Sequence, residues 1–334
     1  MKSDLEMTRR LKKLARSIDA VKDKSKTISS GGTNLPACIK QGVLTPRRED
    51  IRTFSELVNH YSAMAQYSES AGLMMHHIYE QGWIFHFDDL GNSGYFIDTD
   101  EQIIYIDHAG LDARAVVCSD YFYAACMMNV LRGLRDAWQE NRWLNAPRTY
   151  HPESILMLEK LRAADSDITA IILAGELQIA GQACFARHVQ ASEDAAMARA
   201  IYEDLHDMKS RASSAYRKWF LDEERVNTTD HETLCYLDSF LEDSPLSNPF
   251  GQARLTPVEI VRMGCFPDGT SYLAGYGEAV LRDPVFAGLG DPVNQAHYYH
   301  ILRDMDSYVV NGVPFRSASL AARIFPEDET VIQE

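Results

Sequence analysis

The stretch from Ala113 to Arg142 constrains the fold more than any other part of the sequence. Its first half contains YFYAACMMNVL, which is apolar at nearly every position, and its second half, RGLRDAWQENRW, is amphipathic with helical spacing. A helix that is apolar on almost every side must be covered by other elements. The stretch therefore predicts a buried central helix, around which the rest of the fold is built.

The segments before this helix predict further helices and a small sheet. Residues 51–81 have apolar side chains at helical spacing and end at Gly82, which predicts one or two helices. Three short segments rich in aromatic and β-branched residues follow, at residues 83–87, 94–98 and 102–107, separated by the turn sequences DDLGNS and TDE. We expect these three segments to form a small antiparallel sheet.

The segments after the central helix are mostly helical. Periodicity predicts four helices, at residues 153–163, 167–190, 192–219 and 229–242. Asp167 is the predicted N-cap of the second helix, since Asp is a favoured capping residue. Beyond about residue 245 the sequence is rich in Pro, Gly and Asp, which predicts loops with short helices near 256–263 and 293–305.

These elements predict an α+β fold that is mainly α, in which a helical domain carries a small antiparallel sheet. With 334 residues and 46% hydrophobic side chains, the chain can bury a substantial core without disulfides or a structural metal. We expect three regions. They are a basic N-terminal helix and flexible linker at residues 1–45, the helical domain with its sheet at 46–244, and a loop-rich C-terminal extension at 245–334.

The charged residues are distributed unevenly. Residues 1–26 carry nine Lys and Arg against four Asp and Glu, so that of the total charge of −15 these residues hold +5 and the remainder holds −20. An acidic body repels a phosphate backbone, and nucleic-acid binding is therefore expected only through residues 1–26. These residues could also tether a helical adaptor to an anionic surface.

The composition favours a cytoplasmic location. The N-terminal residues are charged throughout, whereas a secretory signal requires an apolar run, and no stretch of about 18 apolar residues occurs that would predict a membrane span. The six cysteines are scattered without a CxxC pair, which favours reduced thiols.

The order of the predicted elements carries a resemblance to a known family. GYFIDTDEQIIYID leads into the long buried helix, which ends in LRGLRDAWQENRW. This arrangement resembles the minimal zincin core, and the helix resembles the active helix of a bacterial zinc metallopeptidase family, which reads HELRHAWQ. In that family the two histidines bind Zn²⁺ and the glutamate is the general base for a metal-bound water. The resemblance covers about residues 80–240 and implies a zincin-like topology.

The positions that correspond to the family's catalytic motif are replaced in this sequence. When LRDAWQ is aligned with the family's LRHAWQ, the first histidine becomes Arg132, the glutamate becomes Gly133 and the second histidine becomes Asp136. A guanidinium group is always protonated and cannot ligate a cation, and glycine offers no base. Arg132 and Asp136 are one helical turn apart, and an ion pair between them in place of the metal is a hypothesis.

Glu176 is a candidate for the family's third ligand, which is a glutamate on a following helix. It lies in ILAGELQIAGQACFARH. In a second register, IAGQA matches the family's EADA-like sequence and the ligand position is apolar, and the sequence leaves both registers open. The later stretch SAYRKWFLDEERVNTTDHETLCYLD also resembles the family's downstream helices.

Histidine pairs on predicted helices offer other metal ligands. His297 and His300 share a helical face with Asp304 and are candidates for a metal site. The adjacent His76 and His77 point in different directions on a helix and cannot both face one metal.

Acidic residues in the predicted turns and elsewhere favour a structural interpretation. Turns select Asp for backbone reasons, which accounts for Asp88, Asp89, Asp98, Asp100 and Asp107.

The sequences Asp107-His108 and Asp230-His231-Glu232 offer acid and base groups without an identifiable nucleophile. The sequence contains no GxSxG, Walker A, GxGxxG or CxxC motif that would indicate another class of enzyme.

The sequence therefore favours a catalytically degenerate metallopeptidase-like protein that acts in binding or regulation, with no cofactor and with an unidentified protein partner. One alternative is a metal-dependent hydrolase or peptidase in which zinc has non-standard ligands, either Asp136 with Glu176 or His297 with His300. Another is the helical adaptor tethered through its basic N-terminal arm.

Overall fold

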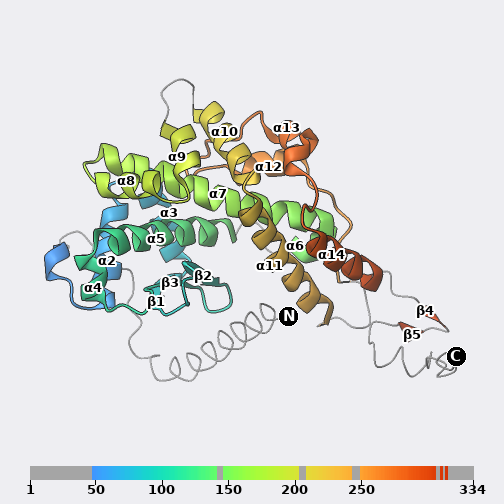
Figure 1. Cartoon of the computed structure of the whole chain (residues 1–334), viewed down its shortest axis with the longest axis horizontal. Coiled ribbons are helices and arrows are strands. Elements are labelled where there is room, and N and C mark those ends of the chain that lie inside the picture. The colour runs from blue at the N-terminus through green and yellow to red at the C-terminus, as the bar shows by residue number, and fades with distance from the viewer. Residues whose placement is uncertain are drawn as a thin grey trace, which may run out of the picture. The chain divides into compact units, whose positions relative to one another are not determined.

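The computed structural model, shown in Figure 1, is α+β and mainly α in the part of the chain that it describes, as predicted. It describes residues 47–140, 146–202, 208–242, 249–305, 309–310 and 313–314. The predicted basic helix, the arm and the linker within residues 1–45 lie outside these ranges.

The described residues divide into two compact units. The first contains residues 47–137 together with Glu176–His188. The second contains Trp138–Gly175 and the described residues from Val189 onward. The three predicted regions stay a prediction, because the first of them and much of the C-terminal extension lie outside the described residues.

Two capped helices open the first unit. The helix α2 (Phe54–Ala65) begins with a capping box, in which the Thr53 hydroxyl accepts a hydrogen bond from the Glu56 N–H and the Glu56 carboxylate accepts one from the Thr53 N–H. The helix α3 (Glu69–Glu80) begins at Ser68, whose hydroxyl also accepts a backbone hydrogen bond. These caps explain why the first predicted helical stretch is two helices.

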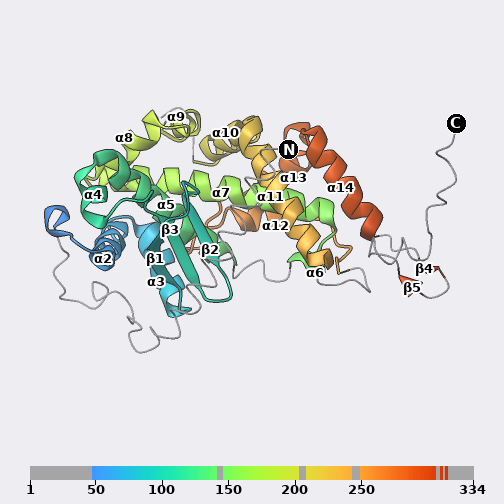
Figure 2. The same ribbon diagram turned by 60° about the horizontal axis from the view of Figure 1, so that its bottom comes forward.

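The sheet of the first unit has three strands, β1 (Ile84–Asp88), β2 (Tyr95–Asp98) and β3 (Ile103–Asp107), in the order β1-β3-β2 (Figure 2). β2 and β3 form an antiparallel hairpin, whereas β1 pairs with β3 in parallel. The prediction of a wholly antiparallel sheet is therefore wrong. The reason is that β2 pairs with the strand that follows it through a short turn, which leaves β1 to pair with the opposite edge of β3.

The predicted central helix is two helices, α4 (Ala113–Cys118) and α5 (Asp120–Glu140). A short 3₁₀ helix, η2 (Arg48–Asp50), precedes α2. Met127, Leu131 and Leu134 of α5 are fully buried, which confirms the predicted burial of its apolar part.

An aromatic cluster packs around Tyr123 of α5. The Tyr123 hydroxyl lies 2.8 Å from Nε2 of His60, and the Tyr61 hydroxyl donates a 2.8 Å hydrogen bond to the Tyr123 carbonyl. The ring of Phe185 lies 5.6 Å from that of Tyr123, centroid to centroid, and the Arg48 guanidinium lies 4.0 Å above the same ring. These contacts attach α5 to α2 within the first unit.

The chain after α5 is helical in most of its described residues. The elements in chain order are α6 (Ala146–Thr149), α7 (Pro152–Ile179), α8 (Ala183–Ala191), α9 (Ala195–Tyr202), α10 (Met208–Phe220), α11 (Glu223–Glu242), α12 (Pro257–Met263), α13 (Gly277–Arg282), the 3₁₀ helix η3 (Pro284–Phe286), α14 (Pro292–Met305) and the paired strands β4 (Val309–Val310) and β5 (Val313–Pro314). The short helices predicted near the C-terminus correspond to α12 and α14, and α13 was not predicted.

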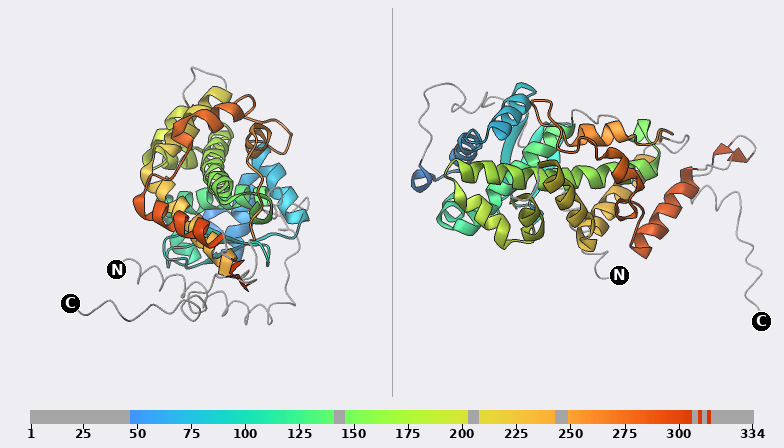
Figure 3. Two further views of the ribbon diagram at one scale, coloured as in Figure 1. Left: turned by 90° about the vertical axis from the view of Figure 1, so that its right-hand side faces the viewer. Right: turned by 90° about the horizontal axis from the view of Figure 1, so that it is seen from above.

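The helix α7 joins the helix predicted at 153–163 to the first part of the helix predicted at 167–190, and the remainder of the latter forms the separate helix α8. The left view of Figure 3 looks nearly along the axis of α7. The prediction that Asp167 is an N-cap is therefore wrong, because the buried residues before it continue the helix. The Asp167 carboxylate instead accepts hydrogen bonds from Nε1 of Trp219 at 2.9 Å and from Nη1 of Arg225 at 2.8 Å.

Within the described ranges, none of these helices combines the length and the apolar character needed to cross a lipid bilayer.

Candidate functional site

Gly133, which aligns with the general base of the family that the sequence resembles, lies where α5 packs on the sheet. A side chain at this position would begin 2.5 Å from the Cγ2 methyl group of Ile104 and 3.4 Å from a ring carbon of Tyr95. Ile104 is fully buried and β-branched, so that this methyl group is held close to the backbone of β3. The motif's glutamate therefore has no room at residue 133.

Arg132 and Asp136, which align with the histidines of the family that the sequence resembles, lie one turn apart on α5, and both are partly exposed. Nη1 of Arg132 donates a 3.3 Å hydrogen bond to Oδ1 of Asn129. The ion pair between Arg132 and Asp136 stays a hypothesis.

Arg135, which lies between these positions, was not predicted as a functional or core residue. Its side chain is fully buried in the first unit, with Nη1 at 3.8 Å from the Met74 sulfur on α3. Arg132 and Arg135 thus place two guanidinium groups, which are always protonated, on α5.

Glu176 has hydrogen-bond donors that give it a structural role. One carboxylate oxygen accepts from the Ser68 hydroxyl at 2.6 Å, and the other accepts from the Ser70 hydroxyl at 3.0 Å. Because Ser68 is also the N-cap of α3, the carboxylate fixes the start of that helix.

The structure separates the two histidines of α14 by environment. Nε2 of His297 pairs with the Asp238 carboxylate of α11, whereas His300 is exposed. The His297 ring lies 6.5 Å from that of His231, centroid to centroid. Among the residues that the structure describes, no three His, Cys, Asp or Glu side chains are arranged to hold a metal ion.

The adjacent histidines of α3 have separate neighbours, in agreement with the prediction that they face different directions. Nε2 of His76 lies 3.2 Å from the Glu80 carboxylate, and Nε2 of His77 lies 2.9 Å from the Gln81 amide.

Aspartates of the turns accept hydrogen bonds from backbone N–H groups. Asp98 accepts from Asp100 and Glu101, and Asp107 accepts from Leu90 and Ala109. These bonds agree with the structural interpretation of the acidic turns.

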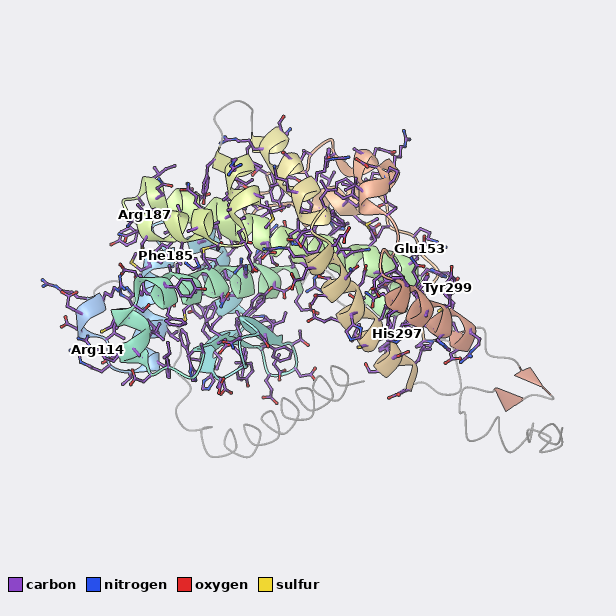
Figure 4. All side chains as sticks on the ribbon, viewed as in Figure 1. Arg114, Glu153, Phe185, Arg187, His297 and Tyr299 are labelled. Atoms are coloured by element: carbon purple, nitrogen blue, oxygen red, sulfur yellow. The ribbon has the colours of Figure 1, made fainter. Side chains whose placement is uncertain are left out.

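A cavity of about 970 Å³ lies in the second unit, between α7 and α14. Figure 4 shows Glu153 of α7 and Tyr299 of α14, both of which line it. Its volume lies at the upper end of the range of about 300–1,000 Å³ that is common for small-molecule sites. The apolar part of its wall includes Leu156, Met157, Leu255, Phe286, Leu302 and Met305.

A buried ion pair forms one part of the cavity wall. Lys160 lines the cavity with a side chain that is only 3% exposed, and its ammonium nitrogen lies 3.0 Å from the fully buried carboxylate of Asp230 on α11. The same nitrogen donates a 2.8 Å hydrogen bond to the Gly288 carbonyl. Burial raises the pKa of Asp230, and the positive charge of Lys160 opposes that rise.

The outer part of the cavity carries a second ion pair and two tyrosines. Arg254 pairs with Glu153, and both side chains are more than half exposed. Tyr298 is partly buried, and its burial raises the pKa of its hydroxyl to about 12. The phenol of Tyr298 is therefore neutral at physiological pH. The neighbouring Tyr299 is 68% exposed.

The sequence contains one signal for this site that was missed. Lys160 lies four residues after Leu156 and four before Ala164, both of which are buried, so that it occupies the apolar stripe of its helix. A lysine on such a stripe requires a buried partner. Asp230 was recognised only as one of several acid and base groups without an identifiable nucleophile. The pairing with Lys160 was missed because 70 residues separate the two, and helical periodicity does not predict such pairs.

Comparison of the chain with protein-family models, with curated proteins and with solved structures finds no match.

Proposed function

We propose that this chain is a catalytically degenerate, zincin-like relative of the bacterial zinc metallopeptidases, and that it acts by binding rather than by peptide hydrolysis. The observation that supports this most is the packing at Gly133. A glutamate in this position would overlap the Ile104 methyl group, so that the general base has lost both its side chain and the space for it.

The charges on α5 support the same proposal. A zinc site needs neutral imidazoles or anionic ligands around the ion. Arg132 and Arg135 instead bring two permanent positive charges to this helix, one partly and one fully buried. A guanidinium group has no lone pair to offer and cannot ligate a divalent cation.

The binding role is supported by the cavity of the second unit, which has the volume of a small-molecule site. The proposal includes an unidentified protein partner and a cytoplasmic location. Free thiols are typical of reducing compartments, and the cysteines within the described ranges are free: Cys118, Cys126, Cys184, Cys235 and Cys265.

The test is the zinc and manganese content of the purified, tag-free protein, measured by elemental mass spectrometry, together with hydrolysis of an unstructured protein substrate. We expect metal near zero per chain and no hydrolysis above that of a buffer control. About one metal ion per chain with hydrolysis would overturn the proposal. Loss of that metal in D136A or in H297A would then identify which alternative ligand set holds it.

A further inference from the structure

One face of the three-stranded sheet in the first unit exposes apolar and aromatic side chains. Successive residues of a strand point to opposite faces, and Ile104 and Ile106 of β3 are fully buried beside Gly133 of α5. The face away from α5, here called the outer face, therefore carries the residues that alternate with these two and their partners in register: Ile84, His86, Phe96, Ile103 and Tyr105. In Figure 1 the strands lie below α5, and Figure 2 turns their lower side toward the viewer.

Three rings form a row across the outer face, one from each strand. The register pairs His86 of β1 and Phe96 of β2 with Tyr105 of the middle strand β3. The Tyr105 ring lies 5.6 Å from that of His86 and 6.3 Å from that of Phe96, centroid to centroid. Phe96 is 36% exposed, and Ile84 is 42% exposed. These side chains offer a flat surface to apolar groups of a partner.

The outer face lies in a segment whose Asp and Glu residues are not balanced by basic ones. Residues 82–110 contain six Asp and Glu and no Lys or Arg. Burial raises the pKa of Tyr105, at the centre of the ring row, to about 12. Three carboxylates add to this rise through their negative charge and therefore lie near the outer face: Asp98, Asp88 and Glu101. A partner that matches this face is both apolar and basic.

Residues 1–26 of the chain, which lie outside the described ranges, combine these two properties. They carry nine Lys and Arg against four Asp and Glu. Lys and Arg alternate there with apolar residues that recur at helical spacing, namely Leu11, Leu14, Ile18 and Val21. Such a segment can place apolar side chains on the ring row and basic side chains on the carboxylates around it.

The chain between residue 26 and the described part is long enough for this contact. At about 3.3 Å per residue, residues 27–46 span up to about 66 Å when extended. They join the described part close to the sheet, since the ring of Phe54 in α2 lies 5.1 Å from that of Phe87 in β1. A tethered segment has a high effective concentration at the face, which favours it over a separate basic molecule.

We propose that the outer face of the sheet binds residues 1–26 of the same chain. Their apolar side chains cover Phe96 and Ile84, and their Lys and Arg pair with the surrounding carboxylates, among them Glu101. Residues 1–26 are then not free to tether the chain to an anionic surface, and a protein partner on this face has to displace them. The contact does not depend on the loss of catalysis proposed above, and neither metal content nor hydrolysis bears on it.

Carbodiimide cross-linking of the full-length protein tests the contact. The reagent joins a lysine ammonium to a carboxylate that it touches, and mass spectrometry of the digested protein locates the bond. We expect links from Lys12 and Lys13 to Glu101. Links to Glu224 of α11, an exposed carboxylate of the second unit, should be at least about fivefold rarer. Equal yields at Glu101 and Glu224, or no link to Glu101, would overturn the proposal.

A mixture of ¹⁵N-labelled and unlabelled protein distinguishes the same chain from a second copy. Links within one chain join peptides that carry the same label, and we expect only these. Linked peptides with mixed labels would show that residues 1–26 bind a second copy, which contradicts the assignment to the same chain. Repetition in about 1 M salt should lower the yield, because screening weakens exposed charge pairs.

The outer face itself is tested with the double variant F96K/E101K, which places two positive charges on exposed positions. Links from Lys12 to Asp100 should fall about fivefold, because the variant removes an apolar contact and repels the basic segment. The matched control L73K/E69K makes the same changes at exposed positions of α3, and its yield should stay within about twofold.

A variant outside the sheet keeps the test decisive should F96K/E101K not fold. R9E/R10E reverses two charges of the basic segment and leaves the sheet unchanged. The yield of links from Lys12 to Glu101 should again fall about fivefold. An unchanged yield in either folded variant would show that residues 1–26 do not bind the outer face.

Discussion

Gly133 on α5 and Lys160 on α7 are both buried helical positions, one in each compact unit, and they differ in what lies opposite them. At Gly133 a methyl group of β3 takes the space of the missing side chain. At Lys160 the structure keeps a cavity beside a charged group that is almost completely buried. Whether a buried position can serve in catalysis or binding therefore depends on the space next to the residue as much as on the residue itself.

The largest effect is expected from Gly133→Glu, which would restore the motif's glutamate. The new side chain would overlap the Ile104 methyl group and place a carboxylate among apolar residues, and it should cost at least about 4 kcal/mol of unfolding free energy or prevent folding. Gly133→Ala should cost about 1–2 kcal/mol, because overpacking exceeds the gain in helix propensity. Urea unfolding measures both.

The matched control for these variants is Gly72→Ala in α3. There the nearest atom to a new Cβ is the end of the flexible Gln66 side chain, so the variant should be neutral or slightly stabilised. If Gly133→Ala were as stable as Gly72→Ala, there would be space for a side chain between α5 and the sheet. The contrast between the filled space at Gly133 and the cavity at Lys160 would then disappear.

The next largest effect is expected from Lys160→Met, which tests the buried ion pair beside the cavity of the second unit. It leaves the Asp230 carboxylate buried without its partner, and should cost about 3 kcal/mol of unfolding free energy. The double variant K160M/D230N should recover most of this loss, because no unpaired charge remains. A double variant no more stable than Lys160→Met would show that the loss comes from packing and not from the ion pair.

A smaller effect is expected on the pH dependence of stability in Lys160→Met. This pH dependence should have the opposite sign to that of a salt-bridged carboxylate. Burial raises the pKa of Asp230 from its ordinary 3.8, and removal of Lys160 removes the group that opposes the rise. A carboxyl group with a raised pKa stabilises the folded state at low pH, and this contribution is lost as the pH rises through the folded pKa. The stability lost in Lys160→Met should therefore be smaller at pH 5 than at pH 8, as measured by urea unfolding. An equal loss at both values would contradict the assignment to Asp230.

The smallest effect is expected at the surface of α5, from a double-mutant cycle of Arg132→Ala and Asp136→Ala. An ion pair one helical turn apart should give a coupling free energy of about 0.3–0.5 kcal/mol. Thermal unfolding in low salt and again in 1 M salt measures it, since salt should abolish the coupling. A coupling of zero in low salt would show that Arg132 and Asp136 form no ion pair.

The sequence predicted the type of most elements because their signals are local. The apolar run before Arg132 predicted a buried helix, and Met127 and Leu131 are fully buried. The pairing of β1 was predicted wrongly, because alternation within a strand does not show which neighbour it will pair with. Asp167 was misread because a residue typical of caps also serves as a hydrogen-bond acceptor in the middle of a helix.

The sites were less predictable than the fold, because they depend on distances between remote residues. The alignment identified Arg132 and Gly133 by their sequence neighbours, but only the position of Ile104 shows that the space is closed. The cavity beside Lys160 depends on Asp230 and Gly288, which are 70 and 128 residues further along the chain. Its volume is a property of tertiary packing, and no periodic pattern in the sequence specifies it.

The strand order β1-β3-β2 also determines when the sheet can assemble during synthesis on the ribosome. β1 pairs only with β3 in this sheet, and it emerges from the ribosome before β3 has been synthesised. The hairpin of β2 and β3 can close by itself, because its strands are adjacent in the chain. Until then Phe85 and Phe87 of β1, both buried in the finished protein, stay available to chaperones that bind emerging apolar segments.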